Sequence, residues 1–214
     1  FTELEIFIIV LIAVIAGLSV ADEFSKGTIK QLLIKPYTRM QVLTSKYISS
    51  LSIILFGFVS LILMELLVGG ILFGFNTLSV PVVIYNYNEA MVQTYNVFAY
   101  LGIIFINKLP MFILMTTLIF FLSVSTINGA ISVSIGIVGY TISAVINNLA
   151  TYYNVVILKF FPSLNWDLTI YLFGNLPLNK NLNYNLSIIL NIVYFIIMII
   201  PIFIIFKKKN IKNV

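Results

Sequence analysis

Charged side chains are scarce in this 214-residue sequence, and the densest group of them lies in residues 22–46. That stretch holds seven of the nineteen charged residues: Asp22, Glu23, Lys26, Lys30, Lys35, Arg39 and Lys46. Carboxylates, amines and a guanidinium can form ion pairs and can bind a polar surface of another protein. Thiolate and imidazole chemistry is excluded because the sequence has no cysteine and no histidine. We therefore expect these residues to recognise a partner, and we expect no catalytic, metal or cofactor site on this chain.

The sequence as a whole has the composition of an integral membrane protein. It is 61% hydrophobic and 9% charged, whereas soluble domains are about 45–50% apolar and about 25% charged. The basic residues stand at the ends of apolar runs, so the net charge of +5 indicates membrane orientation. The sequence does not show the basic face interleaved with exposed aromatic residues that is typical of nucleic-acid binding. We therefore expect a membrane lipid environment and no nucleic-acid partner.

The charged stretch lies between two apolar runs of membrane length. We expect a transmembrane helix at about residues 4–21, which would be ~27 Å long, and a second one at about residues 46–75. In a helical projection of residues 24–35, two lysines lie opposite an apolar arc, and Pro36 ends the helix. The prediction is a short helix at about residues 24–35 that lies along the membrane surface.

Three further apolar runs complete a predicted all-α bundle in a single domain, residues 1–214. A polar loop rich in Tyr and Asn precedes the first run, and a broken amphipathic segment with Trp and Tyr precedes the last. Such aromatic residues favour the headgroup layer, so we expect short interfacial or re-entrant helices in the broken segment. The predicted elements are an outer loop at residues 76–96, spans at about 97–124, 129–147 and 186–206, the broken segment at 149–185, and a basic tail at 207–214.

The distribution of basic residues predicts the orientation of the bundle. Nine of them fall in residues 26–46 and 207–212, whereas Lys159 and Lys180 fall in segments expected on the opposite side. Because cytoplasmic segments carry an excess of Lys and Arg, we expect the charged stretch and the C-terminus in the cytoplasm. The first of the five predicted spans then begins outside and the last ends inside. Because the number of spans is odd and the visible start lies outside, we expect a sixth helix upstream of residue 1.

Apart from Glu5 and Lys46 at the starts of two predicted spans, the charged residues within the spans are Glu65 and Lys108, and both lie near the expected outer interface. The simplest interpretation is that the Lys108 side chain snorkels to the headgroup layer. There are two alternatives, because charges within a membrane are often functional. Lys108 forms an outer-side ion pair with Glu65, or it contacts a transported molecule.

Small residues recur at three- and four-residue spacings in the predicted span at 129–147. Such residues let helix backbones approach closely in a membrane, where no hydrophobic force drives helices together. We therefore predict close helix packing, with a pore-lining role as the alternative. The packing residues are Gly129, Ala130, Gly136, Gly139 and Ser143.

The charged stretch resembles the signature of ABC-2-type permeases, the membrane subunits of bacterial ABC exporters. The shared pattern is E-x-x-x-G-T-x-x-x-L-L-x-x-P-x-x-R, followed by a lysine that opens the next helix. In this sequence the pattern is carried by Glu23, Gly27, Thr28, Leu32, Leu33, Pro36, Arg39 and Lys46. The resemblance also includes the short turn before residue 130, the broken segment and the basic tail, so it covers essentially the whole chain apart from a first helix.

The resemblance implies a fold and a set of partners. The fold is the helical bundle of type V ABC exporters, in which the short cytoplasmic helix is a coupling helix seated in a groove of a separate ATP-binding subunit. The residues implied in this coupling are Glu23, Gly27, Thr28, Lys30, Leu32, Leu33, Pro36, Arg39 and Lys46. The chain has no G-x-x-x-x-G-K-[ST] phosphate loop, so ATP and Mg would be bound by the partner subunit. A second permease subunit, identical or different, would complete the transporter.

The function that this resemblance implies is ATP-driven export across the bacterial cytoplasmic membrane by alternating access. Closure of two ATP-binding subunits would move two coupling helices together and switch a cavity from inner to outer access. Lining by Phe, Tyr, Ile and Met favours hydrophobic or amphipathic cargo, such as a peptide toxin or antimicrobial peptide; another hydrophobic drug, antibiotic or lipid is the alternative. From another class, the alternative is a non-transporting membrane assembly or sensory subunit.

Overall fold

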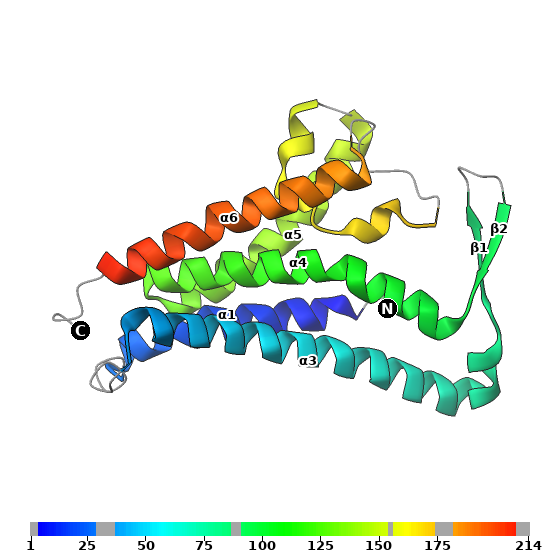
Figure 1. The fold of residues 1–214 in the computed structure, drawn as a ribbon, viewed down its shortest axis with the longest axis horizontal. Helices are drawn as coiled ribbons and strands as arrows, with labels where there is room; N and C mark the ends of the chain where they lie inside the picture. The colour runs from blue at the N-terminus through cyan, green and yellow to red at the C-terminus, as the bar shows by residue number, and fades with distance from the viewer. Residues whose placement is uncertain (1–3, 29–36, 87–90, 154–155, 174–181, 209–214) are drawn as a thin grey trace. The chain divides into compact units, whose positions relative to one another are not determined.

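Five long apolar helices dominate the computed structural model, which describes residues 4–28, 37–86, 91–153, 156–173 and 182–208. Each of the five is long and apolar enough to cross a membrane, which confirms the predicted class of multi-pass helical membrane protein. Figure 1 shows them in chain order, and they are α1 (Glu5–Ser25), α3 (Arg39–Phe73), α4 (Val97–Thr126), α5 (Gly129–Tyr153) and α6 (Tyr184–Lys208).

Side-chain caps explain where four of these helices begin. Helices α4, α5 and α6 each follow an asparagine whose Oδ1 accepts a backbone N–H of the first turn: Asn96, Asn128 and Asn183. Helix α3 has a reciprocal capping box, in which Thr38 N donates to Gln41 Oε1 at 2.8 Å and Gln41 N donates to Thr38 Oγ1 at 3.3 Å. This box places the start of α3 at Arg39, ahead of the predicted start at residue 46.

Helix α1 continues past its predicted end at residue 21 and stops at Ser25. Gly27 follows with a φ of +70°, the left-handed conformation that glycine adopts without steric cost after a helix. Residues 24 and 25 of the predicted surface helix therefore belong to α1. Most of that predicted helix, residues 29–35, lies outside the described residues.

The predicted loop at residues 76–96 contains regular structure. A 3-10 helix, η1 (Phe75–Ser79), leads into an antiparallel hairpin of β1 (Val82–Asn86) and β2 (Met91–Tyr95). The pairing runs from Val82 opposite Tyr95 to Asn86 opposite Met91. The run Val82-Val83-Ile84 is rich in β-branched side chains, which fit a pleated strand. The chain is therefore mostly, but not entirely, helical.

The predicted broken segment before the last span is built from 3-10 turns. Helix α5 first extends to Tyr153, beyond its predicted end at residue 147. Three short elements follow, namely η2 (Val156–Phe160), η3 (Pro162–Leu164) and η4 (Leu168–Tyr171). We call residues 156–171 the 3-10 segment.

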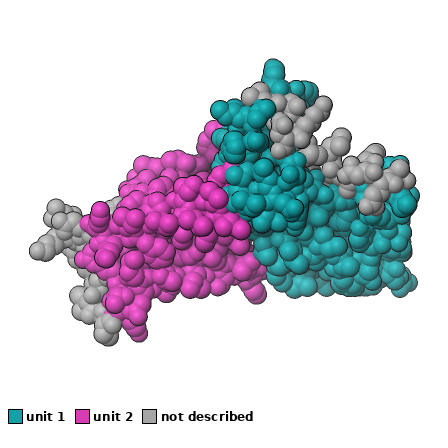
Figure 2. Space-filling model, turned by 45° about the horizontal axis from the view of Figure 1, so that its top comes forward, with its two compact units in different colours: residues 1, 58–111, 144–191 teal, residues 2–57, 112–143, 192–214 magenta. Residues whose placement is uncertain are grey.

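The chain divides into two compact units, drawn in teal and magenta in Figure 2. Unit 1 consists of residues 58–111 and 144–191 together with residue 1, and unit 2 of residues 2–57, 112–143 and 192–214. In unit 1, Ala150, Leu164 and Leu182 form a buried apolar cluster, with Ile146, Leu158, Tyr171 and Leu186 packed against it. This cluster joins the 3-10 segment to α5 and α6.

Helix α1 lies at the centre of unit 2, because it contacts all four of the other long helices there. Its buried face consists of Ile8, Ile9, Ile12, Ala13, Ala16, Gly17, Val20, Ala21 and Phe24. The neighbouring positions on the other helices are Gly57 of α3 beside Leu11, Ser123 of α4 beside Ala21, Gly136 of α5 beside Ala13, and Phe206 of α6 beside Phe24. A displacement of α1 would therefore be transmitted to each of these helices.

Candidate functional site

Five helix ends meet at one end of unit 2. The C-terminal part of α1 lies beside the first turns of α3, because Lys46 contacts Ser19 and Glu23. The last turns of α4 and α6 reach the same end, where Ser123 contacts Ala21 and Phe206 contacts Phe24. Helix α5 begins there beside Leu18 of α1. The polar and charged residues around these contacts form the candidate site.

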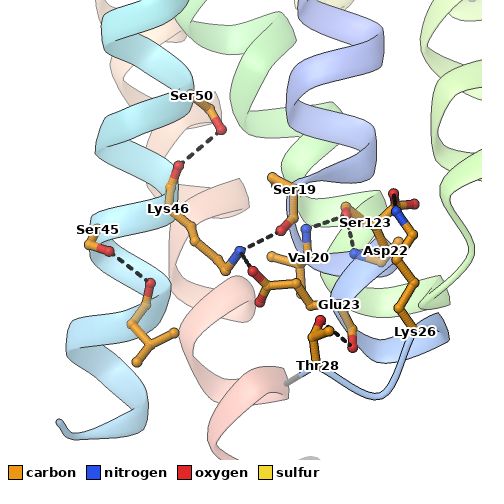
Figure 3. Close-up of polar contacts among 12 residues, drawn as sticks. Ser19, Val20, Asp22, Glu23, Lys26, Thr28, Ser45, Lys46, Ser50 and Ser123 are labelled. Carbon is orange, nitrogen blue, oxygen red and sulfur yellow. Dashed lines mark hydrogen bonds and ion pairs between the residues drawn. The ribbon is translucent and has the colours of Figure 1, made fainter. Parts of the chain in front are cut away.

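Glu23 and Lys46 form the central ion pair of this site (Figure 3). Lys46 Nζ pairs with Glu23 Oε1 and also donates a hydrogen bond to the Ser19 carbonyl at 2.7 Å. The two side chains are only 16% and 23% exposed, so water screens this pair weakly. Glu23 Oε2 is buried, and among the described residues it has no hydrogen-bond partner. The pair fixes the two ends of the intervening chain, residues 24–45, to one another.

Ser123 ties α4 to α1 beside this pair. Its hydroxyl oxygen accepts hydrogen bonds from the backbone N–H of Ala21 at 3.0 Å and of Val20 at 3.4 Å (Figure 3). The Ser123 side chain is fully buried, and Val20 and Ala21 lie on the buried face of α1. A hydroxyl that accepts from a helix backbone in an apolar core holds two helices at a short and defined separation.

The end of α1 next to the ion pair is polar and accessible. Asp22 Oδ2 lies 2.7 Å from Lys26 Nζ, an i, i+4 pair whose side chains are 36% and 68% exposed. Thr28 Oγ1 donates to the Glu23 carbonyl at 3.4 Å. A Cβ added to Gly27 would meet no atom of the described residues within 4 Å. The Asp22–Lys26 pair is therefore accessible, whereas the Glu23–Lys46 pair is mostly enclosed.

Close helix packing supports the site from the α5 side. A Cβ added to Gly129 would lie 2.5 Å from Leu18 Cδ2, and one added to Gly136 would lie 2.6 Å from Ile119 Cδ1. Gly17 of α1, which we did not predict from the sequence, makes a similar approach to Val133. Each of these contacts requires that the glycine position carry no side chain, because a side chain of the neighbouring helix fills that space.

The other predicted packing residues of α5 lie differently. Gly139 and Ala130 are exposed, and a Cβ at Gly139 would meet nothing within 4 Å, so Gly139 makes no close approach to the described chain. Ser143 is buried, and its hydroxyl donates to the Tyr140 carbonyl of its own helix at 2.6 Å.

Four of the residues implied in coupling, Lys30, Leu32, Leu33 and Pro36, lie outside the described residues. Arg39 is the first residue of α3 and is exposed. The described part of the chain holds no group of three or more His, Cys, Asp or Glu residues that could bind a metal ion.

Comparison with known proteins identifies the family. The family described as "Protein of unknown function (DUF2705)" matches residues 2–212. The chain belongs to the DUF2705 family. It is also 31% identical over 207 residues to the "Uncharacterized protein YhcI" of Bacillus subtilis (strain 168), an alignment that covers 94% of this chain. The DUF2705 chain spans 63% of the length of that relative. No solved structure matches this chain.

The DUF2705 chain has a second polar cluster, in unit 1. Lys108 Nζ lies 2.6 Å from Asp167 Oδ2, and this partner was not predicted from the sequence. The predicted ion pair between Lys108 and Glu65 stays a prediction. Near Lys108, the Tyr184 hydroxyl donates to Asn107 Oδ1 at 3.0 Å. Burial raises the pKa of the Tyr171 phenol, and the hydrogen bond with Ser187 only partly offsets this rise. The Tyr171 side chain is therefore a neutral hydroxyl.

Proposed function

We propose that this chain is the membrane-spanning subunit of an ATP-driven exporter of the ABC-2 type, with ATP hydrolysis on a separate subunit. The observation that carries the proposal is the Glu23–Lys46 ion pair. These two residues are the first and last members of the sequence pattern that resembles the ABC-2 permease signature. Their contact is a physical reason for both residues to occur in one pattern, since each compensates the charge of the other away from bulk water.

The position of α1 supports a coupling role for the segment between these two residues. The segment starts at the end of α1 and returns at the start of α3, and the ion pair joins those two points. A force that a partner applies to the segment would therefore act on α1 directly. Because α1 contacts α3, α4, α5 and α6 in unit 2, the whole unit would respond to that force.

The distribution of charge at this end of unit 2 favours a cytoplasmic location. Lys26 and Lys46 lie at the end of α1 and the start of α3, and Lys207 and Lys208 lie in the last turn of α6. Since Phe206 packs on Phe24, the ends of α1 and α6 lie together. An excess of lysine at one end of a helical membrane protein is typical of the cytoplasmic face, where an ATP-binding subunit would dock.

The proposed transporter requires further components. Two ATP-binding subunits would supply ATP and Mg, and a second permease subunit would form the other half of the translocation path. Apolar and aromatic side chains predominate on the described helices, and this composition favours a hydrophobic or amphipathic cargo, with a peptide toxin or antimicrobial peptide as the first candidate.

Co-purification tests the proposal. The tagged full-length protein is isolated in mild detergent from membranes of its native host, and ATP hydrolysis is measured before and after reconstitution in lipid vesicles. We expect an ATP-binding subunit at a stoichiometric ratio and measurable ATP turnover by the purified complex. Purification of the intact protein without ATP turnover or an ATP-binding subunit would overturn the proposal.

A further inference from the structure

Lys108 and Asp167 form a buried ion pair in unit 1. Lys108 lies in α4 and is 3% exposed, and its Nζ lies 2.6 Å from Asp167 Oδ2. A charge inside a membrane-length helix is costly unless a partner of opposite charge compensates it. Asp167 provides that compensation from the 3-10 segment, so the pair connects this segment to α4.

Asp167 also organises the 3-10 segment itself. Its second oxygen, Oδ1, accepts hydrogen bonds from Thr169 N at 3.0 Å and from Thr169 Oγ1 at 2.5 Å. Asp167 is therefore the N-cap of η4, and both carboxylate oxygens have partners. The cap needs only a side-chain oxygen that accepts a hydrogen bond, and an asparagine can also provide one. The contact with Lys108, in contrast, needs the negative charge of the carboxylate.

Neutral hydrogen bonds join the 3-10 segment to α6. The Ser187 hydroxyl donates to Asn165 Oδ1 at 2.8 Å, and Asn191 Nδ2 donates to the Asn165 carbonyl at 2.9 Å. The hydroxyls of Tyr171 and Ser187 lie 2.6 Å apart. Asn165 and Ser187 are completely buried, so these bonds exchange little with water.

The contact with α5 is also neutral, and it is backed by apolar packing. The Ser163 hydroxyl donates to Asn147 Oδ1 at 2.7 Å. Beside it, Leu164 of the 3-10 segment packs in the buried cluster with Ala150 of α5. Separating the segment from α5 would expose this hydrocarbon to water, which is unfavourable.

We propose that the Lys108–Asp167 pair is a latch: it reversibly joins the 3-10 segment to α4, and the segment leaves α4 with α5 and α6 still attached. When such a pair opens, both charges gain water, and a hydrated pair loses little by separating. The apolar contacts with α5 gain nothing on opening. The aromatic contact of Phe173 with Tyr100 of α4, with ring centroids 5.1 Å apart, parts together with the latch.

A single tryptophan makes the latch observable. Trp166 is the one tryptophan of the sequence, it precedes Asp167, and it is 7% exposed. The full chain is reconstituted in lipid vesicles, and the emission of Trp166 and its quenching by acrylamide are measured. For Asp167→Asn, which keeps the cap but removes the negative charge that faces Lys108 Nζ, we expect emission at longer wavelength and stronger quenching.

Two further variants test whether charge is the cause. Lys108→Met with Asp167→Asn removes both charges, so quenching should return to the level of the unmodified chain. Thr169→Val removes one hydrogen bond to Asp167 but keeps the ion pair, and quenching should not change. Unchanged quenching in the Asp167→Asn variant, or no return in the double variant, would overturn the latch.

Cysteine labelling separates opening from unfolding. The sequence has no cysteine, so Ala150→Cys, a fully buried position in the α5 cluster, is a unique reporter. In the Asp167→Asn background we expect the introduced thiol to stay protected from a water-soluble maleimide. Labelling of that thiol would show that the segment detaches from α5 as well, which contradicts the proposal. None of these readouts involves ATP, so the latch and the exporter function succeed or fail separately.

Discussion

Lys46 of α3 pairs with Glu23 of α1 and also donates to the Ser19 carbonyl, so one ammonium joins the two helices. Replacing Lys46 with methionine leaves a mostly buried carboxylate without its partner. We expect a loss of stability between the about 0–1 kcal/mol of an exposed pair and the about 3–5 kcal/mol of a fully buried one. Thermal unfolding of the purified protein in detergent measures this loss.

The Asp22–Lys26 pair is the matched control for this experiment, because it has the same chemistry but is well exposed. Lys26→Met should change stability by no more than about 0.5 kcal/mol. The double variant Glu23→Gln with Lys46→Met should be less destabilised than Lys46→Met alone, because no charge is left uncompensated. Equal losses for Lys26→Met and Lys46→Met would show that burial of the pair is unimportant.

Gly27 is the second position at which we predict an effect, and the reason is its backbone. Its φ of +70° suits glycine, and no atom of the described residues lies within 4 Å of an added Cβ, so we expect backbone strain to limit substitution. Valine should cost at least about 1–2 kcal/mol in this conformation, whereas asparagine adopts it readily. Under the proposed function, Gly27→Val should uncouple ATP hydrolysis from transport while Gly27→Asn retains coupling. Identical transport by the two variants would remove Gly27 from the coupling role.

The five long helices could be predicted from the sequence because apolar runs of membrane length have few other structures available to them. Their ends were less predictable. Helix α3 starts at Arg39 because Thr38 and Gln41 cap it, and this T-x-x-Q signal was present but was outweighed by the charge at Lys46. The hairpin was obscured by the Asn and Tyr residues around its short β-branched run.

The pairing of charges could be predicted only in part. Glu23 and Lys46 were both recognised as members of one pattern, but their contact depends on α1 and α3 running antiparallel with matching ends. For Lys108, the contact with Asp167 arises because the 3-10 segment folds back beside α4. The local sequence Asp167-x-Thr169 indicates a cap, yet it does not indicate which helix the carboxylate meets.

Gly136 and Gly139 offer a third test, since they lie in the same helix but in different surroundings. A side chain at Gly136 would meet Ile119 and Ala13, so Gly136→Val should destabilise unit 2 by about 1–3 kcal/mol. A Cβ at Gly139 would meet no described atom within 4 Å, so Gly139→Val should leave the stability of the isolated chain unchanged. Thermal unfolding in detergent compares the two variants. A loss of stability at Gly139 alone would contradict the packing of α5 on α1 described above.

The orientation of the chain is the last prediction, and it can be tested by cysteine labelling because the natural sequence has no cysteine. Val83 of β1 is 63% exposed, whereas Asn86 of the same strand is buried, so Val83→Cys is the better reporter of the hairpin. Lys26→Cys reports the opposite end of α3, where Lys46 pairs with Glu23. In intact cells, a membrane-impermeant maleimide should label Val83→Cys at once and Lys26→Cys only after permeabilisation, because the basic end is expected inside. The reverse pattern would place the Glu23–Lys46 pair outside the cell, beyond the reach of any ATP-binding subunit, and would refute the proposed function.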